Sequence, residues 1–253
     1  MIVKKKPFEC GDLKGWVQLN EARKGSTVAK VDAQSIAQRK CFLCRENRPA
    51  DQEARELVPG WELLVNPYPV FEPHYTIASK EHTPQVLSVE VASKWAEILP
   101  GMVVFYNDPG AGASAPDHAH YQAVRKECLP LINLLDSNWQ DDWEIADKQG
   151  IYQLNLPFKI FAGSNPGRID KLPSRPLNAY IWKTESGDMR YVIIPRRAHR
   201  PDLYFLDPPE RRAFSPGAID MAGVLITPFE EDYDNITPDE IYHIYEEVGF
   251  RNE

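Results

Sequence analysis

The sequence predicts an α+β fold made of two similar halves, and three observations lead to this. First, 253 residues with 43% hydrophobic and 11% aromatic side chains suffice for one large domain or two fused half-domains. Second, the segments 77–84 (IASKEHTP) and 194–201 (IPRRAHRP) share an aliphatic first residue, a basic fourth residue, a histidine and a proline, and each follows a strand-like run. Third, the order around the first segment is strand, strand, helix, strand, loop, strand, which mixes both element types within one half.

The first half can be divided into elements most easily. Trp61–Val65 and His74–Ser79 have the composition of strands, and the proline-broken segment 66–73 joins them as a turn. Thr83 is a good helix N-cap, and Pro84 suits the first helical position. Apolar residues recur at helical spacing at positions 87, 91, 95, 98 and 99. The sequence therefore predicts a helix that begins after Thr83.

Three further elements follow this helix in the first half. Gly101 ends the helix, 102–106 (MVVFY) is a strand, and the loop 107–117 leads to a last strand, 118–124 (HAHYQAV). His82 then lies beside the helix N-terminus, whose positive dipole end disfavours an imidazolium. We therefore expect a neutral His82 ring, suited to metal ligation or hydrogen bonding.

Charge and targeting signals exclude several classes of protein. With 29 basic and 37 acidic residues, the formal net charge of -8 has the wrong sign for a chain that coats nucleic acid non-specifically. No apolar leader follows the first lysines, and no apolar run approaches the ~18 residues that span a bilayer. We therefore expect a soluble, cytoplasmic protein with no nucleic-acid or membrane partner.

The four cysteines are too few for a disulfide scaffold. Cys41 and Cys44 form a Cys-x-x-Cys pair, which indicates metal binding or redox chemistry.

The segment 118–122 (HAHYQ) carries the strongest chemical signal. If it is a strand, alternation places His118, His120 and Gln122 on one face. The preceding loop, rich in glycine and alanine, lets backbone amides approach an anion closely. A neutral imidazole can attack phosphorus when one ring nitrogen is free and the other is held as N–H by an acceptor.

Two other interpretations of this segment stay open from the residues alone. The histidines can be buried and satisfied core residues. Alternatively, Gly112 and the His-x-His pair can begin the metal site of a cupin dioxygenase. The cupin interpretation lacks its glutamate, because Val124 and Arg125 occupy the expected places.

The same segment, with the loop before it, resembles a known signature. Asn107, Gly112, Ser114, His118, His120 and Gln122 are similar to the active-site pattern of the galactose-1-phosphate uridylyltransferase branch of the histidine-triad superfamily. The segments 16–23, 41–48 (CFLCRENR), 65–69 (VNPYP) and 73–82 (PHYTIASKEH) resemble further parts of that branch, although Pro67 replaces an expected aspartate. The resemblance runs from 16 to 124 and weakly to 229. The closest similarity is to a bacterial group akin to GDP-hexose phosphorylases and diadenosine tetraphosphate phosphorylases.

The resemblance implies an architecture and a reaction. The fold would be two fused histidine-triad-like halves, each an antiparallel β-sheet with helices packed on it. An N-terminal substrate-contacting segment (1–40) would precede a catalytic half (41–145) and a degenerate second half (146–253). His120 would attack the α-phosphorus of a nucleoside-diphosphate sugar or dinucleoside polyphosphate, and inorganic phosphate or a sugar phosphate would then accept the nucleotide. The oligomeric state stays open, with a homodimer among the alternatives.

Roles for single residues follow from the same resemblance. His118 and Gln122 would orient the nucleophile and the phosphate, and Gln122 and Ser114 would be donors to phosphoryl oxygens. The expected nucleotide- and phosphate-binding residues are Asn66, Asn107, Gly112, Arg23, Arg48 and Lys159, with Arg45 and Arg197 as further candidates to hold the acceptor. Cys41, Cys44, His82 and His118 would bind a structural zinc. Related phosphorylases lack this metal, so a metal-free protein is the alternative.

The resemblance leaves two rival functions. One is a zinc-stabilised nucleotide-binding module without turnover, and the other is a histidine-triad-type nucleotide hydrolase. Gln122 in the third position of the triad favours transfer over hydrolysis, because an amide cannot hand a proton to a poor leaving group. In the second half, the strand near 223–231 that should correspond to 118–122 has no histidine pair, so His199 is expected to be structural. His243 lies in a helical segment and is expected to be a packed or solvated side chain rather than a ligand.

Overall fold

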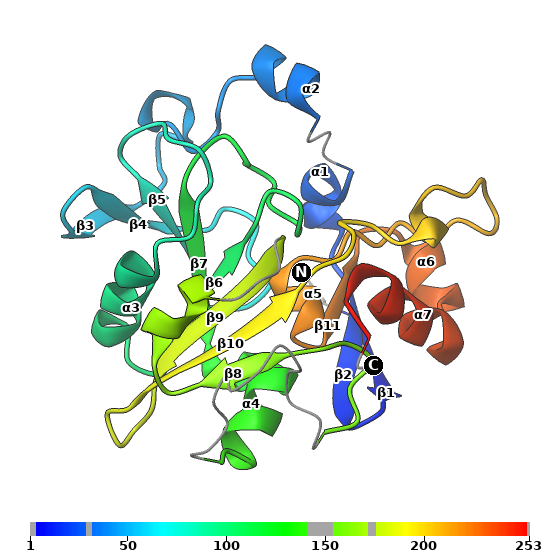
Figure 1. The fold of residues 1–253 in the computed structure, drawn as a ribbon. Coiled ribbons are helices and arrows are strands. Elements are labelled where there is room, and N and C mark those ends of the chain that lie inside the picture. The colour runs from blue at the N-terminus through cyan, green and yellow to red at the C-terminus, as the bar shows by residue number, and fades with distance from the viewer. Residues whose placement is uncertain (1–3, 29–31, 141–153, 172–175, 252–253) are drawn as a thin grey trace.

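The computed structural model describes residues 4–28, 32–140, 154–171 and 176–251, and its centre is one eight-stranded sheet (Figure 1). The strands of this sheet, in spatial order, are β3 (Ala54–Val58), β4 (Trp61–Val65), β5 (His74–Ser79), β7 (His120–Arg125), β6 (Met102–Asn107), β9 (Leu177–Lys183), β10 (Met189–Pro195) and β8 (Phe161–Gly163). All neighbours are antiparallel. Strands β6 and β9 join the two halves edge to edge, with Val104 opposite Ile181.

A smaller sheet packs against one face of the large one. It contains β1 (Lys4–Cys10), β2 (Leu13–Leu19) and β11 (Val224–Thr227), in that order. β1 and β2 form an antiparallel hairpin, whereas β11 is parallel to β2. The α-helices are α1 (Lys24–Thr27), α2 (Ala33–Gln38), α3 (Val89–Ile98), α4 (Pro130–Ser137), α5 (Ala218–Met221), α6 (Glu230–Asn235) and α7 (Pro238–Val248). None of the described helices has the length and apolarity needed to cross a membrane.

The large sheet is covered on both faces, which explains the uninterrupted apolar run of β6. Val103 and Phe105 point into a core shared with the small sheet and α7. Val104 and Tyr106 point to the opposite face, where Trp95 of α3 packs. Figure 1 shows the same layering, with α3 on one side of the sheet and β1, β2 and β11 on the other. A strand buried on both faces needs apolar residues at every position rather than at alternate ones.

The predicted α+β class is confirmed, and the strands at Trp61–Val65 and His74–Ser79 have the predicted bounds. The domain boundary expected between 145 and 146 falls outside the described residues. The proposed division at this boundary stays a prediction.

The predicted helix start is wrong. Helix α3 begins at Val89, and the Oγ of Ser88 caps it by accepting the Val91 N–H at 3.4 Å. Thr83 therefore does not cap a helix, and His82 does not lie beside a helix N-terminus. The cause is tertiary: the Gln85 backbone N–H donates to the Pro116 carbonyl at 3.1 Å, and the buried Gln85 side chain binds neighbouring backbone groups.

Two strand predictions also need correction. Strand β7 begins at His120, so His118 lies before the strand and alternation does not fix its direction. The segment near 223–231 forms β11, which pairs with β2 in the small sheet. It therefore has no place in the large sheet as a counterpart of β7.

The buried guanidinium of Arg196 joins several segments of the second half by hydrogen bonds. Arg196 is fully buried, and each of its five N–H groups has an acceptor. Nε donates to the Val248 carbonyl, Nη1 to Asn178 Oδ1 at 2.7 Å and to the Pro216 carbonyl, and Nη2 to the carbonyls of Ala198 and His199. Burial lowers the pKa of Arg196 to about 10, which leaves it charged at neutral pH.

We predict that Arg196→Met destabilises the fold by about 3–5 kcal/mol, because five buried acceptors lose their donor. Arg197→Met is the matched control: this neighbouring side chain is exposed, so the same change should stay within about 0.5 kcal/mol. Urea unfolding of the two variants beside the wild type measures both effects. Equal stability losses would show that the Arg196 network does not stabilise the protein.

Candidate active site

A cavity of about 780 Å³ lies at the strand ends of the large sheet, where β6 ends and β7 begins. This volume is typical of a small-molecule site. Both halves contribute to its walls, because the N-terminal segment around Arg23 and the stretch Ser215 to Asp220 line it together with β6 and β7. The predicted site residues that line this cavity are Arg23, Asn66, Asn107, Gly112, Ser114, His120 and Gln122.

The His120 ring is held in one tautomer. Its Nδ1 lies 2.8 Å from the carbonyl oxygen of His118, and a carbonyl can only accept, so Nδ1 carries the proton. The lone pair is therefore on Nε2. Burial lowers the pKa of His120 to about 4, with the His118 hydrogen bond opposing this shift, so the ring is neutral at neutral pH. A neutral imidazole with one fixed N–H and one free lone pair is competent as a nucleophile.

Gln85 clamps the backbone of His120, and the sequence carried no signal for it. Its side-chain Oε1 accepts the His120 N–H at 2.7 Å, and its Nε2 donates to the His120 carbonyl at 2.9 Å. The same Nε2 donates to the Asn107 carbonyl at 3.0 Å. One buried amide therefore fixes the start of β7 against the end of β6.

The Asn107 side chain also has a determined orientation. Its Oδ1 accepts the backbone N–H of Ala218 at 2.7 Å and Nδ2 of Asn178 at 2.9 Å. Asn178 can donate here because its own oxygen accepts from Arg196. Because Oδ1 has both of these partners, the NH₂ group is what Asn107 can offer, as a hydrogen-bond donor, to a ligand in the cavity that this residue lines.

Gly112 is required for close approach of two loops. Its φ is +94°, and a Cβ there would lie 2.6 Å from the Cα of Gly217. Any larger residue would push the loop that carries Ser114 away from the second half.

The turn 66–69 and Arg23 form a neighbouring wall. Asn66 donates from Nδ2 to Thr76 Oγ1 and accepts the Tyr68 N–H, which fixes the turn. Arg23 donates from Nη1 to the Tyr68 carbonyl at 3.1 Å. Burial lowers the pKa of Arg23, and the nearby Asp220 opposes this shift.

Other predicted cations lie away from the cavity. Arg48 pairs with Glu62 at 2.6 Å and donates to the Leu43 carbonyl. The Lys159 ammonium lies 5.5 Å from the Phe161 ring centroid. These two residues, with Arg45 and Arg197, do not line the cavity.

His199 contributes more than the sequence indicated. It lines the cavity, and its Nε2 lies 3.1 Å from Ser215 Oγ. Burial lowers its pKa to about 4. His243, by contrast, is exposed on α7 beside Glu247.

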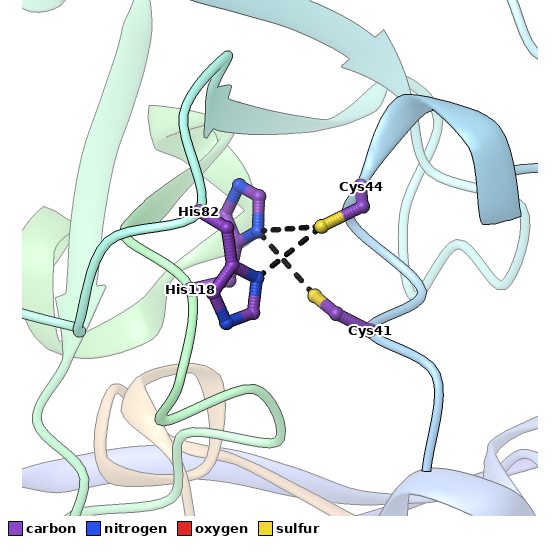
Figure 2. A group of neighbouring side chains, drawn as sticks. All are labelled: Cys41, Cys44, His82 and His118. Atoms are coloured by element: carbon purple, nitrogen blue, oxygen red, sulfur yellow. Dashed lines mark hydrogen bonds between the residues drawn. The ribbon is translucent and has the colours of Figure 1, made fainter.

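The predicted metal ligands come together. Sγ of Cys41 lies 3.3 Å from Nδ1 of His118, Sγ of Cys44 lies 3.2 Å from Nδ1 of His82, and the four donor atoms are all within 4.8 Å of one another (Figure 2). Tetrahedral zinc, with Zn–S near 2.3 Å and Zn–N near 2.0 Å, places neighbouring sulfur and nitrogen ligands about 3.5 Å apart. This donor set therefore fits a zinc ion.

The remote ring nitrogen of His118 also suits a metal site. Nε2 of His118 lies 2.8 Å from the Ser79 carbonyl, and Nε2 of His82 lies 3.8 Å from an Asp117 oxygen. The Ser79 carbonyl is an acceptor of the kind that holds the remote N–H of a ligating histidine, whereas Asp117 is too far from His82 for a hydrogen bond. The predicted shared face of His118 and His120 is wrong, because His118 points to the cysteines while His120 lines the cavity.

Comparisons with known proteins show what this chain is similar to. A family model described as a domain of unknown function (DUF4922) matches residues 1–125. A galactose-1-phosphate uridylyltransferase of Clostridium acetobutylicum is 32% identical over 145 residues, which cover 49% of this chain and 29% of that protein. One of Bacillus subtilis is 24% identical over 238 residues, which cover 79% of this chain and 45% of that protein. The chain thus spans less than half the length of these curated relatives.

The fold has a solved counterpart as well. Yeast Ap4A phosphorylase in complex with Ap4A superposes with a TM-score of 0.65 at 15% identity, covering 100% of this chain and 91% of that one. At this identity the similarity concerns the fold. The chain is thus similar in sequence to galactose-1-phosphate uridylyltransferases and similar in fold to an Ap4A phosphorylase.

Proposed function

We propose that the protein is a nucleotidyltransferase that acts on a nucleoside-diphosphate sugar or a dinucleoside polyphosphate through a covalent His120–nucleotide intermediate. The observation that carries this proposal is the hydrogen bond from His120 Nδ1 to the His118 carbonyl, which leaves the Nε2 lone pair free in a ring that lines the cavity. Relatives named as uridylyltransferases, and a structural neighbour named as a phosphorylase, support the same reaction class.

The reaction proceeds by two displacements. Nε2 of His120 attacks the α-phosphorus of the donor, and the bond from that phosphorus to the bridging oxygen breaks, so the leaving phosphate departs with the electron pair. An oxygen of inorganic phosphate or of a sugar phosphate then attacks the same phosphorus and releases the neutral ring. The proton stays on Nδ1 in both steps, and its hydrogen bond to the His118 carbonyl stabilises the positive charge that develops on the ring.

Neutral donors and one cation meet the phosphoryl oxygens in this scheme. Gln122, Ser114 and Asn107 supply hydrogen bonds, and Arg23 supplies positive charge from the adjoining wall. The Gln122 amide cannot protonate a leaving group, which restricts efficient leaving groups to phosphates. Arg48 and Lys159 have no part here, since they do not line the cavity.

In this proposal the cavity is built from three parts of the chain. The N-terminal segment (1–40) contributes Arg23, the catalytic half (41–145) contributes His120, and the second half (146–253) contributes Ser215 and Asp220 to the cavity wall. We place the protein in the cytoplasm, where thiols stay reduced and can bind metal.

We also propose that Cys41, Cys44, His82 and His118 hold a structural zinc ion, which would supply rigidity and no reaction step. The donor distances support this assignment. By fixing the His118 side chain, the site also steadies the His118 carbonyl that orients His120.

Covalent labelling tests the nucleophile. Wild-type protein is incubated with UDP-galactose, ADP-glucose or Ap4A carrying ³²P in the α-phosphate, quenched, and examined for acid-labile, base-stable label on the chain. We expect label with at least one donor. We expect none on His120→Asn, whose amide can keep the bond to the His118 carbonyl but lacks the attacking nitrogen.

His243→Asn is the matched control, because this exposed histidine should be replaceable without loss of label. Label on His120→Asn would disprove the nucleophile assignment. No label on wild type with any donor would favour a nucleotide-binding module without turnover.

Metal analysis tests the zinc site. We expect about one zinc per chain in the wild type, a near-complete loss in the Cys41→Ser, Cys44→Ser double variant, and a lower melting temperature for that variant. Cys128→Ser, a change at a cysteine outside the cluster, should retain the metal. A metal-free wild type of normal stability would refute the assignment.

A further inference from the structure

A buried histidine lies directly behind Gln122 and does not line the cavity. His74, on β5, is 2% exposed, and its Nε2 lies 2.9 Å from Oε1 of Gln122. Strand pairing explains this contact: His74 is opposite Val124, and Gln122 is two residues earlier on β7, so the two side chains are diagonal neighbours on one face of the sheet. We infer that His74 is a positioning residue that fixes the Gln122 amide with its NH₂ group toward the cavity.

The other ring nitrogen determines the tautomer of His74. The backbone N–H of Val70 points at Nδ1 with a nitrogen-to-nitrogen distance of 3.1 Å. A backbone N–H can only donate, so Nδ1 must carry the lone pair and Nε2 must carry the proton. Burial, reinforced by the nearby charge of Arg23, lowers the pKa of His74 to about 3, which keeps the second proton off the ring at neutral pH.

The tautomer in turn determines which end of the Gln122 amide faces the ring. A protonated Nε2 needs an acceptor at 2.9 Å, and the only acceptor of a glutamine side chain is its oxygen. The oxygen is therefore tied inward to His74. The NH₂ group is what Gln122 can offer to a ligand in the cavity that its side chain lines.

This orientation has a chemical consequence that rests on the proposed function. A side-chain amide has two orientations of nearly equal shape, which differ only in whether oxygen or NH₂ faces the ligand. Phosphoryl oxygens are acceptors, so an amide turned the wrong way would repel the transferring phosphate. His74 removes that choice before substrate binds, and the site is preorganised for an anion.

His74 also couples Gln122 to the turn that carries Val70. The carbonyl of Val70 accepts Nε2 of the buried Gln18 at 3.3 Å, so the small sheet supports this turn from behind. The path from β2 to the cavity therefore runs through Gln18, Val70, His74 and Gln122.

A double-mutant cycle tests this positioning role, with the rate of ³²P labelling by the best donor among UDP-galactose, ADP-glucose and Ap4A as readout. We expect His74→Met to slow labelling about 100-fold, the size of effect seen when one preorganised donor is lost. We expect His74→Gln to stay within about tenfold of wild type, because its Nε2 can replace the imidazole Nε2–H as donor.

The cycle is completed in a Gln122→Met background. If His74 acts through Gln122, adding His74→Met there should change the rate by less than about threefold. A merely structural role would give the same factor in both backgrounds and would overturn the inference. Melting temperatures of all variants show which of them are folded.

A second measurement needs no turnover. Long-range ¹H–¹⁵N NMR of the wild type should show His74 with a protonated Nε2 and a bare Nδ1 between pH 6 and 8, with the His74→Gln spectrum giving the assignment. A protonated Nδ1 would overturn the inference even in an active enzyme. If no donor labels the wild type, the proposed function fails, and this spectrum alone decides the role of His74.

Discussion

One hydrogen bond, from Nδ1 of His120 to the carbonyl of His118, is the constraint on which the site depends. It selects the tautomer of the ring that lines the cavity, and it makes the backbone of His118 part of the site. The side chain of the same residue belongs to the cluster with Cys41 and Cys44. His118 therefore links two centres, its imidazole serving one and its carbonyl the other. This is feasible because His118 precedes β7, where its side chain is free of the strand's alternation.

The polar groups behind the cavity are buried, and each of the key ones has its partners. The Gln85 side chain accepts the His120 N–H and donates to the His120 carbonyl. All five N–H groups of Arg196 have acceptors, and one of these acceptors is the side-chain oxygen of Asn178. Burying an amide or a guanidinium without partners would cost several kcal/mol, so a fully satisfied network is the arrangement that a folded chain tolerates. This network fixes the donor and acceptor ends of the side chains around the cavity in the absence of a ligand.

The two halves share a sheet but serve different purposes. The hairpin β4–β5 leads to His82 in the cysteine–histidine cluster, and the hairpin β9–β10 leads to the buried Arg196 and to His199, which lines the cavity. Similar sequence windows thus end in different environments. Since β11 pairs with β2, it does not take the place beside β10 that β7 takes beside β5; in the described part of the chain, the three-residue strand β8 lies there. The contribution of the second half is the buried charge of Arg196 and part of the cavity wall.

The sequence by itself predicted the fold class, the strands Trp61–Val65 and His74–Ser79 and the position of the His-x-His-x-Gln segment, because period-two patterns and short motifs are local. The grouping of Cys41, Cys44, His82 and His118 was implied by the family resemblance, and the structure brings these four side chains together. The sequence did not determine the start of α3, the opposite directions of His118 and His120, or the burial of Arg196 next to the exposed Arg197. Periodicity fixes a side chain's direction only inside a regular element. In the irregular segments around this site, contacts with residues far away in the chain choose the direction, and only the tertiary structure contains those contacts.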